Sequence, residues 1–506
     1  MLFFWIFLGI LCSALVVILI HDVTQRRHAI LHNFPLIGHF RYLLEKIGPE
    51  LRQYIVTDND EERPFSRDQR TWVYASSKRE NNYFAFGTDN DLELTPNYLI
   101  IKHAAFPLPH HPPETAPIPC AKILGAWRQR RKAFRPASVV NVSAMSYGSL
   151  GAAAVKAINT GCKIAGALHN TGEGGVSDHH RLGGDLVFQI GTAYFGCQEG
   201  GRFSLPRLRE LIDATPQIRA IEIKMSQGAK PGLGGLLPKE KITAEIARIR
   251  GISRDADCVS PSGHSAFHNA DSLLDFIELL AEETGLPVGI KSAVGEQAFW
   301  ADLAGLVERT GRAPDFITVD GGEGGTGASP LVYADHVALP FKLGLPRVIG
   351  EFTRRGIHDR IVFAGSGKLG FPEQALLAFA MGCDLIAVAR EAMLSIGCIQ
   401  AQRCQSGICP AGVATNHPWL MAGLDPQLKS VRLANYLITL RTEILKLCHS
   451  CGVPHPSLIT PDHMEILDGQ LRARSLADAL GTVENNFPRP TESDLALAAA
   501  LMSGHQ

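Results

Sequence analysis

Apolar residues follow three patterns along this chain of 506 residues. Residues 2–20 (LFFWIFLGILCSALVVILI) form an apolar run without a charged side chain. From residue 21 to about 135 the chain is polar and rich in turn-forming residues, as in FPLPHHPPETAPIP at 106–119. Beyond Pro136, short β-branched runs that end near glycine alternate with stretches whose apolar residues recur at helical spacing. The pattern predicts four parts: an anchor (1–22), an irregular wrapping region (23–135), a main domain (136–420) and a helical extension (421–506).

The first apolar run is close to the length of about 20 residues that a membrane-spanning helix needs. A cleavable signal peptide would have a basic start and a small-residue cleavage site, and this run has neither. A hydrophobic docking helix is the other alternative. The nearest basic residues, Arg26 and Arg27, follow the run, so the positive-inside rule places the rest of the chain on the cytoplasmic side. We expect a single-pass anchor at the N-terminus.

The main domain contains eight strand candidates separated by helical stretches. Continuous apolar strands that alternate with helices are typical of a parallel sheet. Eight such units favour a (β/α)8 barrel, also called a TIM barrel, over the alternative of a doubly wound open sheet, because polar residues gather at the carboxyl ends of the strands and a barrel brings those ends to one face. The strand candidates are VVNVSA (139–144), AGALHN (165–170), LVFQIG (186–191), AIEIKM (220–225), PVGIKS (287–292), FITVDG (316–321), RIVFAG (360–365) and DLIAVA (384–389). Residues 424–448 predict a further helix, in a tail that packs on the barrel.

The composition of the chain excludes some classes of function and favours others. The net charge is −1 and the pI about 7.0, so no global field attracts nucleic acid, and we expect no nucleic-acid partner. Eleven scattered cysteines are too few for a small secreted disulfide scaffold. The 49 glycines fall in blocks with acidic and hydroxyl residues, which indicates tight turns around a ligand.

Four glycine-rich blocks follow predicted strands: residues 169–180, 226–238, 320–329 and 364–370. In barrels, the loops after the seventh and eighth strands commonly bind phosphate through backbone N–H groups. Gly365, Ser366 and Gly367 fit that role, with Lys368 or Arg390 supplying positive charge.

Lys291, at the end of a predicted strand, is expected at the barrel mouth. A buried lysine needs an electron-rich partner, and a reduced flavin is one. The alternative is a lysine that reaches solvent.

Three cysteines, Cys398, Cys404 and Cys409, lie within twelve residues and are followed by a proline. The spacing favours an iron–sulfur cluster, and the lack of a fourth nearby cysteine favours a three-iron one. Zinc binding and buried inert cysteines are the alternatives.

Several motifs, in order, resemble the FMN-binding domain of the glutamate synthase large subunit over roughly residues 139–420. They are NVSAMSYGSLG, HNTGEGG, QGAKPG, GGTGASP and C-x5-C-x4-C-P-x-G-V-A-T. Among that family, the chain looks most like the stand-alone, membrane-anchored bacterial members. The resemblance implies a barrel that holds FMN beside a 3Fe-4S cluster bound by the three cysteines. It also implies an oxidoreductase in which electrons pass through the cluster to the flavin, and 2-iminoglutarate, formed from 2-oxoglutarate and ammonia, is reduced to glutamate.

The resemblance also assigns site residues. Lys230 and Arg250 would hold the substrate carboxylates, Glu173 would lie near the imine, and Lys291 would lie near the flavin. The complete set of expected cofactor-binding residues is Ala144, Met145, Ser146, Asn170, Gln189, Lys224, Gln227, Lys291, Asp320, Gly321, Gly322, Gly324, Gly325, Gly365, Ser366, Gly367, Ala389 and Arg390.

Two departures from the family pattern concern the substrate. The family reads GEGGQLP where this chain reads GLGGLLP, with Leu233 and Leu236, and DGGEGG replaces the usual GHDGG. Loss of a polar anchor can change which oxo-acid fits. A flavin-dependent amino-acid or amine dehydrogenase that feeds a membrane carrier is therefore an alternative, and a non-catalytic cofactor-binding module is another. The expected partners are an oxo-acid substrate, an electron donor such as ferredoxin or a membrane carrier, and a separate ammonia-donating subunit.

Overall fold

The computed structural model describes residues 1–25, 28–109, 117–482 and 486–503. Arg26 and Arg27, on which the predicted membrane orientation depends, lie outside the described residues, as do residues 110–116 of the turn-rich stretch. The chain divides into two compact units, residues 1–70 and 71–506.

The first unit is mostly helical. Its elements are α1 (Leu2–Thr24), α2 (Ala29–Asn33), α3 (Ile37–Leu51) and the π-helical turn η1 (Arg52–Val56). By length and composition, α1 can cross a membrane, and its apolar side chains are exposed. Asp22, near the end of α1, accepts hydrogen bonds from the backbone N–H of Leu36 at 3.0 Å and from Nε2 of His39 at 2.9 Å. This carboxylate therefore fixes how the chain turns from α1 toward α3.

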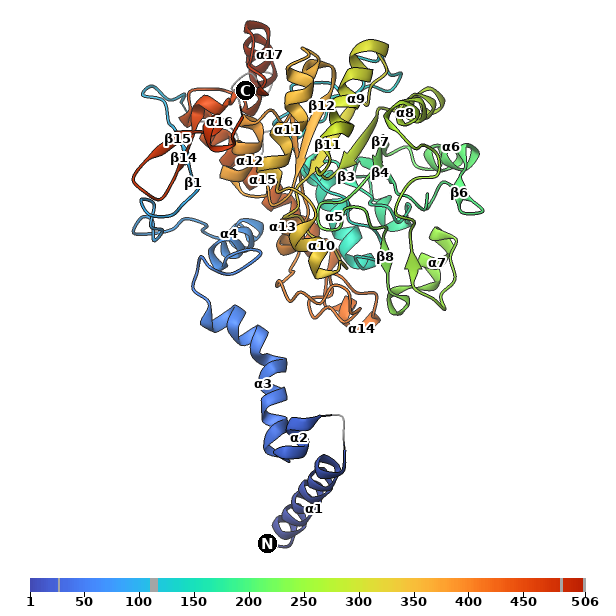
Figure 1. Ribbon diagram of the computed structural model, residues 1–506, viewed down its shortest axis with the longest axis vertical. Helices are drawn as coiled ribbons and strands as arrows, with labels where there is room; N and C mark the ends of the chain where they lie inside the picture. The colour runs from blue at the N-terminus through green and yellow to red at the C-terminus, as the bar shows by residue number, and fades with distance from the viewer. Residues whose placement is uncertain (26–27, 110–116, 483–485, 504–506) are drawn as a thin grey trace. The chain divides into compact units, whose positions relative to one another are not determined.

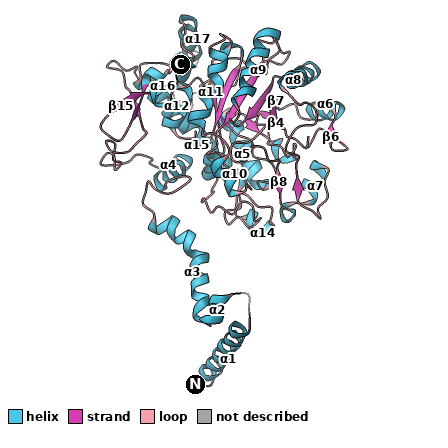
Figure 2. Ribbon diagram, in the orientation of Figure 1, coloured by secondary structure: helices cyan, strands magenta, loops and turns pink. Residues whose placement is uncertain are grey.

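A closed barrel of eight parallel strands forms the centre of the second unit (Figures 1 and 2). Each strand falls on one of the eight predicted runs. The last strand pairs with the first through Ile386 and Val140, so the sheet closes on itself. The (β/α)8 prediction is confirmed, and closure excludes the open doubly wound sheet. The strands are β2 (Val140–Val142), β3 (His169–Asn170), β4 (Leu186–Ile190), β7 (Ile218–Lys224), β10 (Val288–Ser292), β11 (Phe316–Asp320), β12 (Val362–Ser366) and β13 (Leu385–Val388).

Amphipathic helices cover the outside of the barrel. In α8, Leu273, Ile277 and Leu280 recur at helical spacing and are fully buried. The helix begins after an Asn269 capping box and ends at Gly285 in the left-handed conformation, a common helix stop. The helices between and after the barrel strands are α5 (Ala152–Ala165), α6 (Leu205–Asp213), α7 (Ala244–Arg250), α8 (Ala270–Thr284), α9 (Gln297–Thr310), α10 (Leu331–His336), α11 (Phe341–Thr353), α12 (Pro372–Ala380) and α13 (Arg390–Ser395).

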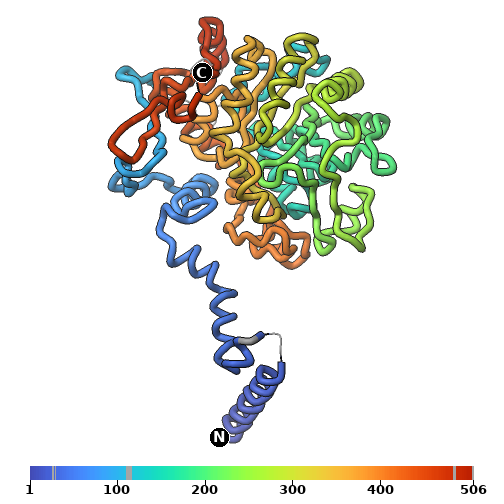
Figure 3. Tube along the Cα trace, in the orientation of Figure 1, coloured from blue at the N-terminus to red at the C-terminus, as the bar shows by residue number. Residues whose placement is uncertain are grey.

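The segments before and after the barrel meet. Strand β1 pairs with β14 in a small antiparallel sheet, so residues near 100 lie beside residues near 465 (Figure 3). The predicted C-terminal helix is α15, which packs along α5. These outer elements are α4 (Arg67–Lys78), α14 (Pro418–Ala422), α15 (Pro426–Ser450), α16 (Leu476–Ala479), α17 (Glu492–Ser503), β1 (Tyr98–Ile101), β14 (Met464–Leu467) and β15 (Ala473–Ser475). Two short antiparallel pairs lie in the barrel loops: β5 (Gln198–Glu199) with β6 (Arg202–Phe203), and β8 (Leu236–Leu237) with β9 (Cys258–Val259).

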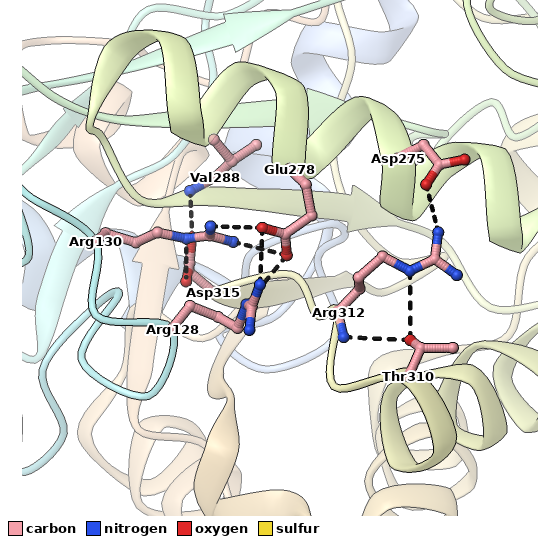
Figure 4. A network of polar contacts seen from close by, with 8 residues as sticks. All are labelled: Arg128, Arg130, Asp275, Glu278, Val288, Thr310, Arg312 and Asp315. Atoms are coloured by element: carbon pink, nitrogen blue, oxygen red, sulfur yellow. Dashed lines mark hydrogen bonds and ion pairs between the residues drawn. The ribbon is translucent and has the colours of Figure 1, made fainter.

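A buried ion network fastens the segment before β2 to the amino end of the barrel (Figure 4). Glu278 on α8 accepts hydrogen bonds from Arg130 at 2.7 Å and from Arg128 at 3.0 Å. Arg130 also donates to Asp315, whose carboxylate accepts the backbone N–H of Val288. Burial raises the pKa of Asp315 to about 6 although Arg130 opposes that shift. Two buried carboxylates thus compensate Arg130 from two neighbouring elements.

We expect Glu278→Ala to lower the free energy of unfolding by about 3 kcal/mol, because it leaves the buried Arg130 short of one partner. Asp275→Ala is the matched control, since Asp275 pairs with Arg312 and its side chain is 67% exposed. An exposed pair contributes less than about 1 kcal/mol. Urea unfolding of the full chain in detergent measures both, and equal losses would contradict the role given to the buried network.

Candidate active site

The carboxyl ends of the barrel strands surround a cavity to which four loops contribute. Ten of its lining residues belong to the cofactor site expected from the sequence: Ala144, Gln227, Lys291, Asp320, Gly324, Gly325, Ser366, Gly367, Ala389 and Arg390. Ser143, Lys368, Ala387 and Glu391 complete the lining. The closed parallel sheet brings these residues together from distant parts of the sequence, because every strand ends at the same face.

Lys291 lies in this cavity and is only 5% exposed, which excludes the alternative of a lysine reaching solvent. Its Nζ lies 3.4 Å from Oδ2 of the buried Asp320. The same carboxylate oxygen accepts the backbone N–H of Gly228 at 2.9 Å. Asp320 therefore compensates the buried ammonium and also ties the loop after β7 to the end of β11.

The chain turns sharply at the end of β12. Gly367 has φ +132° and Lys368 has φ +55°, so the backbone leaves the strand in a conformation that favours glycine. A Cβ on Gly365 would lie 2.7 Å from the ring of Phe341, so this glycine lets α11 pack on the strand. Of the three residues expected to bind phosphate, Ser366 and Gly367 line the cavity, whereas Gly365 lies against α11.

Arg390, at the first position of α13, bridges two of the loops. Its guanidinium donates to the backbone carbonyl of Glu323, and its side chain lies against Gly325. The Glu323 carboxylate accepts the backbone N–H of Phe341 at 2.8 Å, and burial raises its pKa. Gly321 lies against this carboxylate, and Gly322 donates to the carbonyl of Leu339. The unusual glutamate of DGGEGG thus holds the loop after β11 against α11.

A second group of charged side chains gathers beside the cavity, around Glu173. The Glu173 carboxylate accepts a hydrogen bond from Nζ of Lys224 at 2.8 Å. Burial disfavours its ionisation, but Lys224, Lys230 and Arg250 outweigh burial and lower its pKa. One carboxylate is therefore surrounded by three cations.

Lys230 and Arg250 are both 5% exposed. Burial lowers the pKa of Lys230, the neighbouring Lys224 lowers it further, and Glu173 opposes both. Arg250 donates to the carbonyl of Tyr147 at 3.0 Å, and its Nε has no hydrogen-bond partner among the described residues. Positive charge therefore exceeds negative charge at this end of the site.

Gln227 joins the two groups. Its Nε2 donates to the carbonyl of Gly325 at 2.9 Å, and its Oε1 lies 3.3 Å from Nζ of Lys224. His264 accompanies Lys224, with Nε2 2.9 Å from the Lys224 carbonyl oxygen, and burial lowers the pKa of this imidazole. The cavity and the charged group are thus parts of one polar site.

Asn170 and Gln189 lie inside the barrel and are absent from the cavity lining. Both donate to the same oxygen of Glu222, at 2.8 and 2.6 Å, and Thr318 donates to the other oxygen at 2.8 Å. Glu222 is 2% exposed and was missed by the sequence analysis. An acidic residue inside the apolar run AIEIKM was the signal that could have found it.

Met145 and Ser146 pack beneath the glycine loop that carries Glu173. A Cβ on Gly172 would lie 2.5 Å from the backbone nitrogen of Ser146, and one on Gly174 would lie 3.0 Å from the Ser146 side chain. Met145 and Ser146 therefore support that loop from below.

The loop with the two unusual leucines lies directly on Glu173. A Cβ on Gly235 would approach Oε1 of Glu173 to 2.7 Å. Leu236, in β8, is 45% exposed, and Leu233 donates its backbone N–H to the carbonyl of Lys230. The departures from the family pattern therefore fall beside the charged group.

The three cysteines lie in the loop after α13. Cys409 is buried, and Cys398 and Cys404 are partly buried. Nζ of the buried Lys241 donates to the carbonyls of Ser149 and Cys404 at 2.7 and 3.0 Å, and burial lowers its pKa to about 8 against the opposing effect of Cys404 and Cys409. Within residues 1–25, 28–109, 117–482 and 486–503, no three His, Cys, Asp or Glu side chains are assembled into a metal-binding group.

The matching family and the similar sequences agree on one family. Residues 121–454 match a family described as a conserved region in glutamate synthase. The glutamate synthase large subunit-like protein YerD of Bacillus subtilis (strain 168) is 37% identical over 88% of this chain and 91% of its own length. The archaeal glutamate synthase (NADPH) of Methanocaldococcus jannaschii is 32% identical over 62% of this chain and 59% of its own length. Among solved structures, the flavin-binding domain of baker's yeast flavocytochrome b2 has a TM-score of 0.44 at 14% identity and covers 84% of this chain and 82% of its own.

Gly228 offers a test of how the site is assembled. A Cβ at this position would lie 1.9 Å from the carbonyl oxygen of Gly321, so Gly228→Ala forces the loops after β7 and β11 apart. We expect a loss of about 1–3 kcal/mol in unfolding free energy, as for other overpacked sites. Gly295→Ala, in the loop after β10, is the control because its Cβ meets open space. Thermal unfolding of both variants tests this expectation. An unchanged melting temperature for Gly228→Ala would contradict the close approach of Gly228 to Gly321.

Proposed function

This chain belongs to the glutamate synthase family and is an oxidoreductase, and from that premise we propose that it reduces 2-iminoglutarate, formed from 2-oxoglutarate and ammonia, to glutamate. The observation that carries the proposal is the excess of positive charge around Glu173. Two cations suit the two carboxylates of the substrate, and Lys230 and Arg250 supply them beside a single glutamate, Glu173, that already pairs with Lys224.

FMN is the cofactor we propose for the mouth cavity. The backbone turn at Ser366 and Gly367, with Lys368 and Arg390 beside it, suits a phosphate group because it combines close backbone approach with positive charge. The buried Lys291 suits the electron-rich side of a flavin ring. When bound, FMN would supply hydride transfer to a substrate carbon. The fit thus depends on residues from four separate loops.

The protein's own residues position the substrate. Lys230 and Arg250 would bind its carboxylates in a largely buried site, where charge-assisted hydrogen bonds are strong. Glu173, held ionised by Lys224, can accept a hydrogen bond from the protonated imine nitrogen of the substrate and so orient it. Gln227 and Lys224 keep this group next to the mouth cavity. The arrangement separates a carboxylate-binding end from a redox end.

A second candidate function follows from Leu233 and Leu236. These apolar residues lie on the loop that covers Glu173, where the family has polar ones. Such a site suits an amino acid or amine with an apolar side chain, which the enzyme would oxidise while passing electrons to a membrane carrier. In that case the purified protein forms no glutamate from 2-oxoglutarate and ammonia.

The remaining partners are also proposals. The cysteine spacing and the family resemblance support a 3Fe-4S cluster on Cys398, Cys404 and Cys409, with ferredoxin or a membrane carrier as the electron donor. Ammonia would be free or come from a separate subunit. Helix α1 would anchor the chain in a membrane, which agrees with its length and apolar composition. The cytoplasmic placement of the barrel is proposed from Arg26 and Arg27, which follow α1 in the sequence.

The substrate proposal predicts a specific effect of Lys230→Met. With reduced ferredoxin, ammonium and 2-oxoglutarate, we expect the full chain to form glutamate. Loss of one charge-assisted hydrogen bond, about 1.5–3 kcal/mol, should lower kcat/KM for 2-oxoglutarate by about 10- to 150-fold.

The control for this experiment is Lys239→Met, an exposed lysine near the same loop. It should leave kcat/KM unchanged, and neither variant should lose flavin absorbance. Equal effects of the two substitutions would argue against a carboxylate-binding role for Lys230, and no glutamate from the unaltered protein would favour the dehydrogenase.

The cluster proposal predicts about three irons per chain in protein purified without oxygen. Cys409→Ser should remove most of that iron, because a hydroxyl is a poor ligand for the cluster. Cys12→Ser, in α1 and exposed, should retain it. Iron and sulfide analysis of the purified proteins measures the cluster content. If the unaltered protein contains no iron, the three cysteines do not bind a cluster.

A further inference from the structure

A second cavity lies outside the candidate active site, between α5 and α15. Ala137 and Gly166 border it just before β2 and β3 begin, so it lies near the amino ends of the barrel strands, opposite the mouth. Its volume is about 670 Å³, within the range of small-molecule sites. The lining residues are Arg79, Pro117, Ala137, Lys163, Ile164, Ala165, Gly166, Val431, Ala434, Asn435, Ile438 and Arg441.

Arg441 is the unusual residue of this cavity. It is 2% exposed, and its Nη1 donates to the carbonyl of Ala165 at 2.8 Å. Its Nε has no hydrogen-bond partner and its guanidinium no ion pair within the part of the chain that the structure describes. Burial lowers its pKa to about 10, and no carboxylate among the described residues opposes that shift. A guanidinium in this position is costly to bury unless an anion accompanies it.

The carboxyl end of α5 supplies only part of the compensation. Its last turn exposes carbonyl oxygens, and the partial negative charge of a helix end attracts a cation. That interaction provides a hydrogen-bond partner for Nη1 of Arg441, the Ala165 carbonyl, whereas Nε has no partner among the described residues. The helix end alone therefore does not explain why the side chain borders a cavity.

The charged residues that line the described part of the cavity are all cationic. Arg79 and Lys163, both exposed, join Arg441, and none of the lining residues that the structure describes is acidic. Arg79 is oriented by a hydrogen bond of 3.1 Å from its Nε to Asn435. Ile164 and Val431, each about half exposed, supply apolar wall. The cavity thus combines cations with apolar surface.

We propose that this cavity binds an amphipathic anion, with a carboxylate or phosphate group near Arg441 and an apolar portion along Ile164 and Val431. Arginine suits planar anions because its donors form a fixed fork. A free metabolite and a phospholipid head group share this chemistry. The proposal is independent of the reaction at the barrel mouth.

Calorimetric titration of the full chain in uncharged detergent tests the proposal with octanoate, octanol and inorganic phosphate as probes. Octanoate should bind more tightly than octanol, which lacks the charge, and than phosphate, which lacks the chain. Phosphate binding as tightly as octanoate would overturn the apolar half of the proposal, and equal binding of octanol would overturn the ionic half.

Substitutions of the lining residues provide a second test of the proposal. Because Arg441→Met removes a buried side chain and can unfold the protein, the rim pair Arg79→Met/Lys163→Met is the main test. It should weaken octanoate binding by about tenfold or more. Lys156→Met, on α5 but outside the lining, should leave it unchanged.

Lipid nanodiscs distinguish the two sources of the anion. If octanoate does not bind but phosphatidylglycerol nanodiscs raise the melting temperature relative to phosphatidylcholine ones, and Arg79→Met/Lys163→Met abolishes that rise, the ligand is a lipid head group. If Arg79→Met/Lys163→Met keeps an intact fold by circular dichroism but changes neither octanoate binding nor the melting-temperature rise in phosphatidylglycerol nanodiscs, the proposed site does not exist.

Discussion

Closure of the parallel sheet is the constraint on which the rest of this structure depends. The eight strands run parallel and therefore end at one face, and the pairing of β13 with β2 arranges those ends in a ring. Residues as far apart as Ala144 and Arg390 therefore line one cavity. The buried interior of the barrel also explains why Glu222 has three donors from three other strands, since it is only 2% exposed.

Charge is arranged differently at the two ends of the barrel. At the amino end, Arg130 is compensated by Glu278 and Asp315, which suits a structural fastening. At the mouth, Glu173 is outnumbered by cations, which suits a site that awaits an anionic ligand. Arg441 follows the second pattern, although it lies away from the mouth. Both proposed ligand sites thus contain buried cations that outnumber the neighbouring described carboxylates.

The sequence by itself determined the fold class and most of the mouth. Eight apolar runs gave the eight strands, because a strand buried on both faces must be apolar throughout. The glycine blocks indicated where backbones approach closely, as at Gly228 and Gly367. Polar residues at the strand ends could be assigned to one site, since strand direction alone fixes which end they occupy.

Only the tertiary structure decided which of these residues share a cavity and which support it from below. Asn170 and Gln189 point into the barrel toward Glu222, and Gly365 serves the packing of Phe341, because side-chain direction depends on register and tilt that local sequence does not encode. No pattern in the sequence predicted the cavity at Arg441. It arises where α15 returns to α5 across nearly three hundred residues, and contacts at that separation are set by packing rather than by any local pattern.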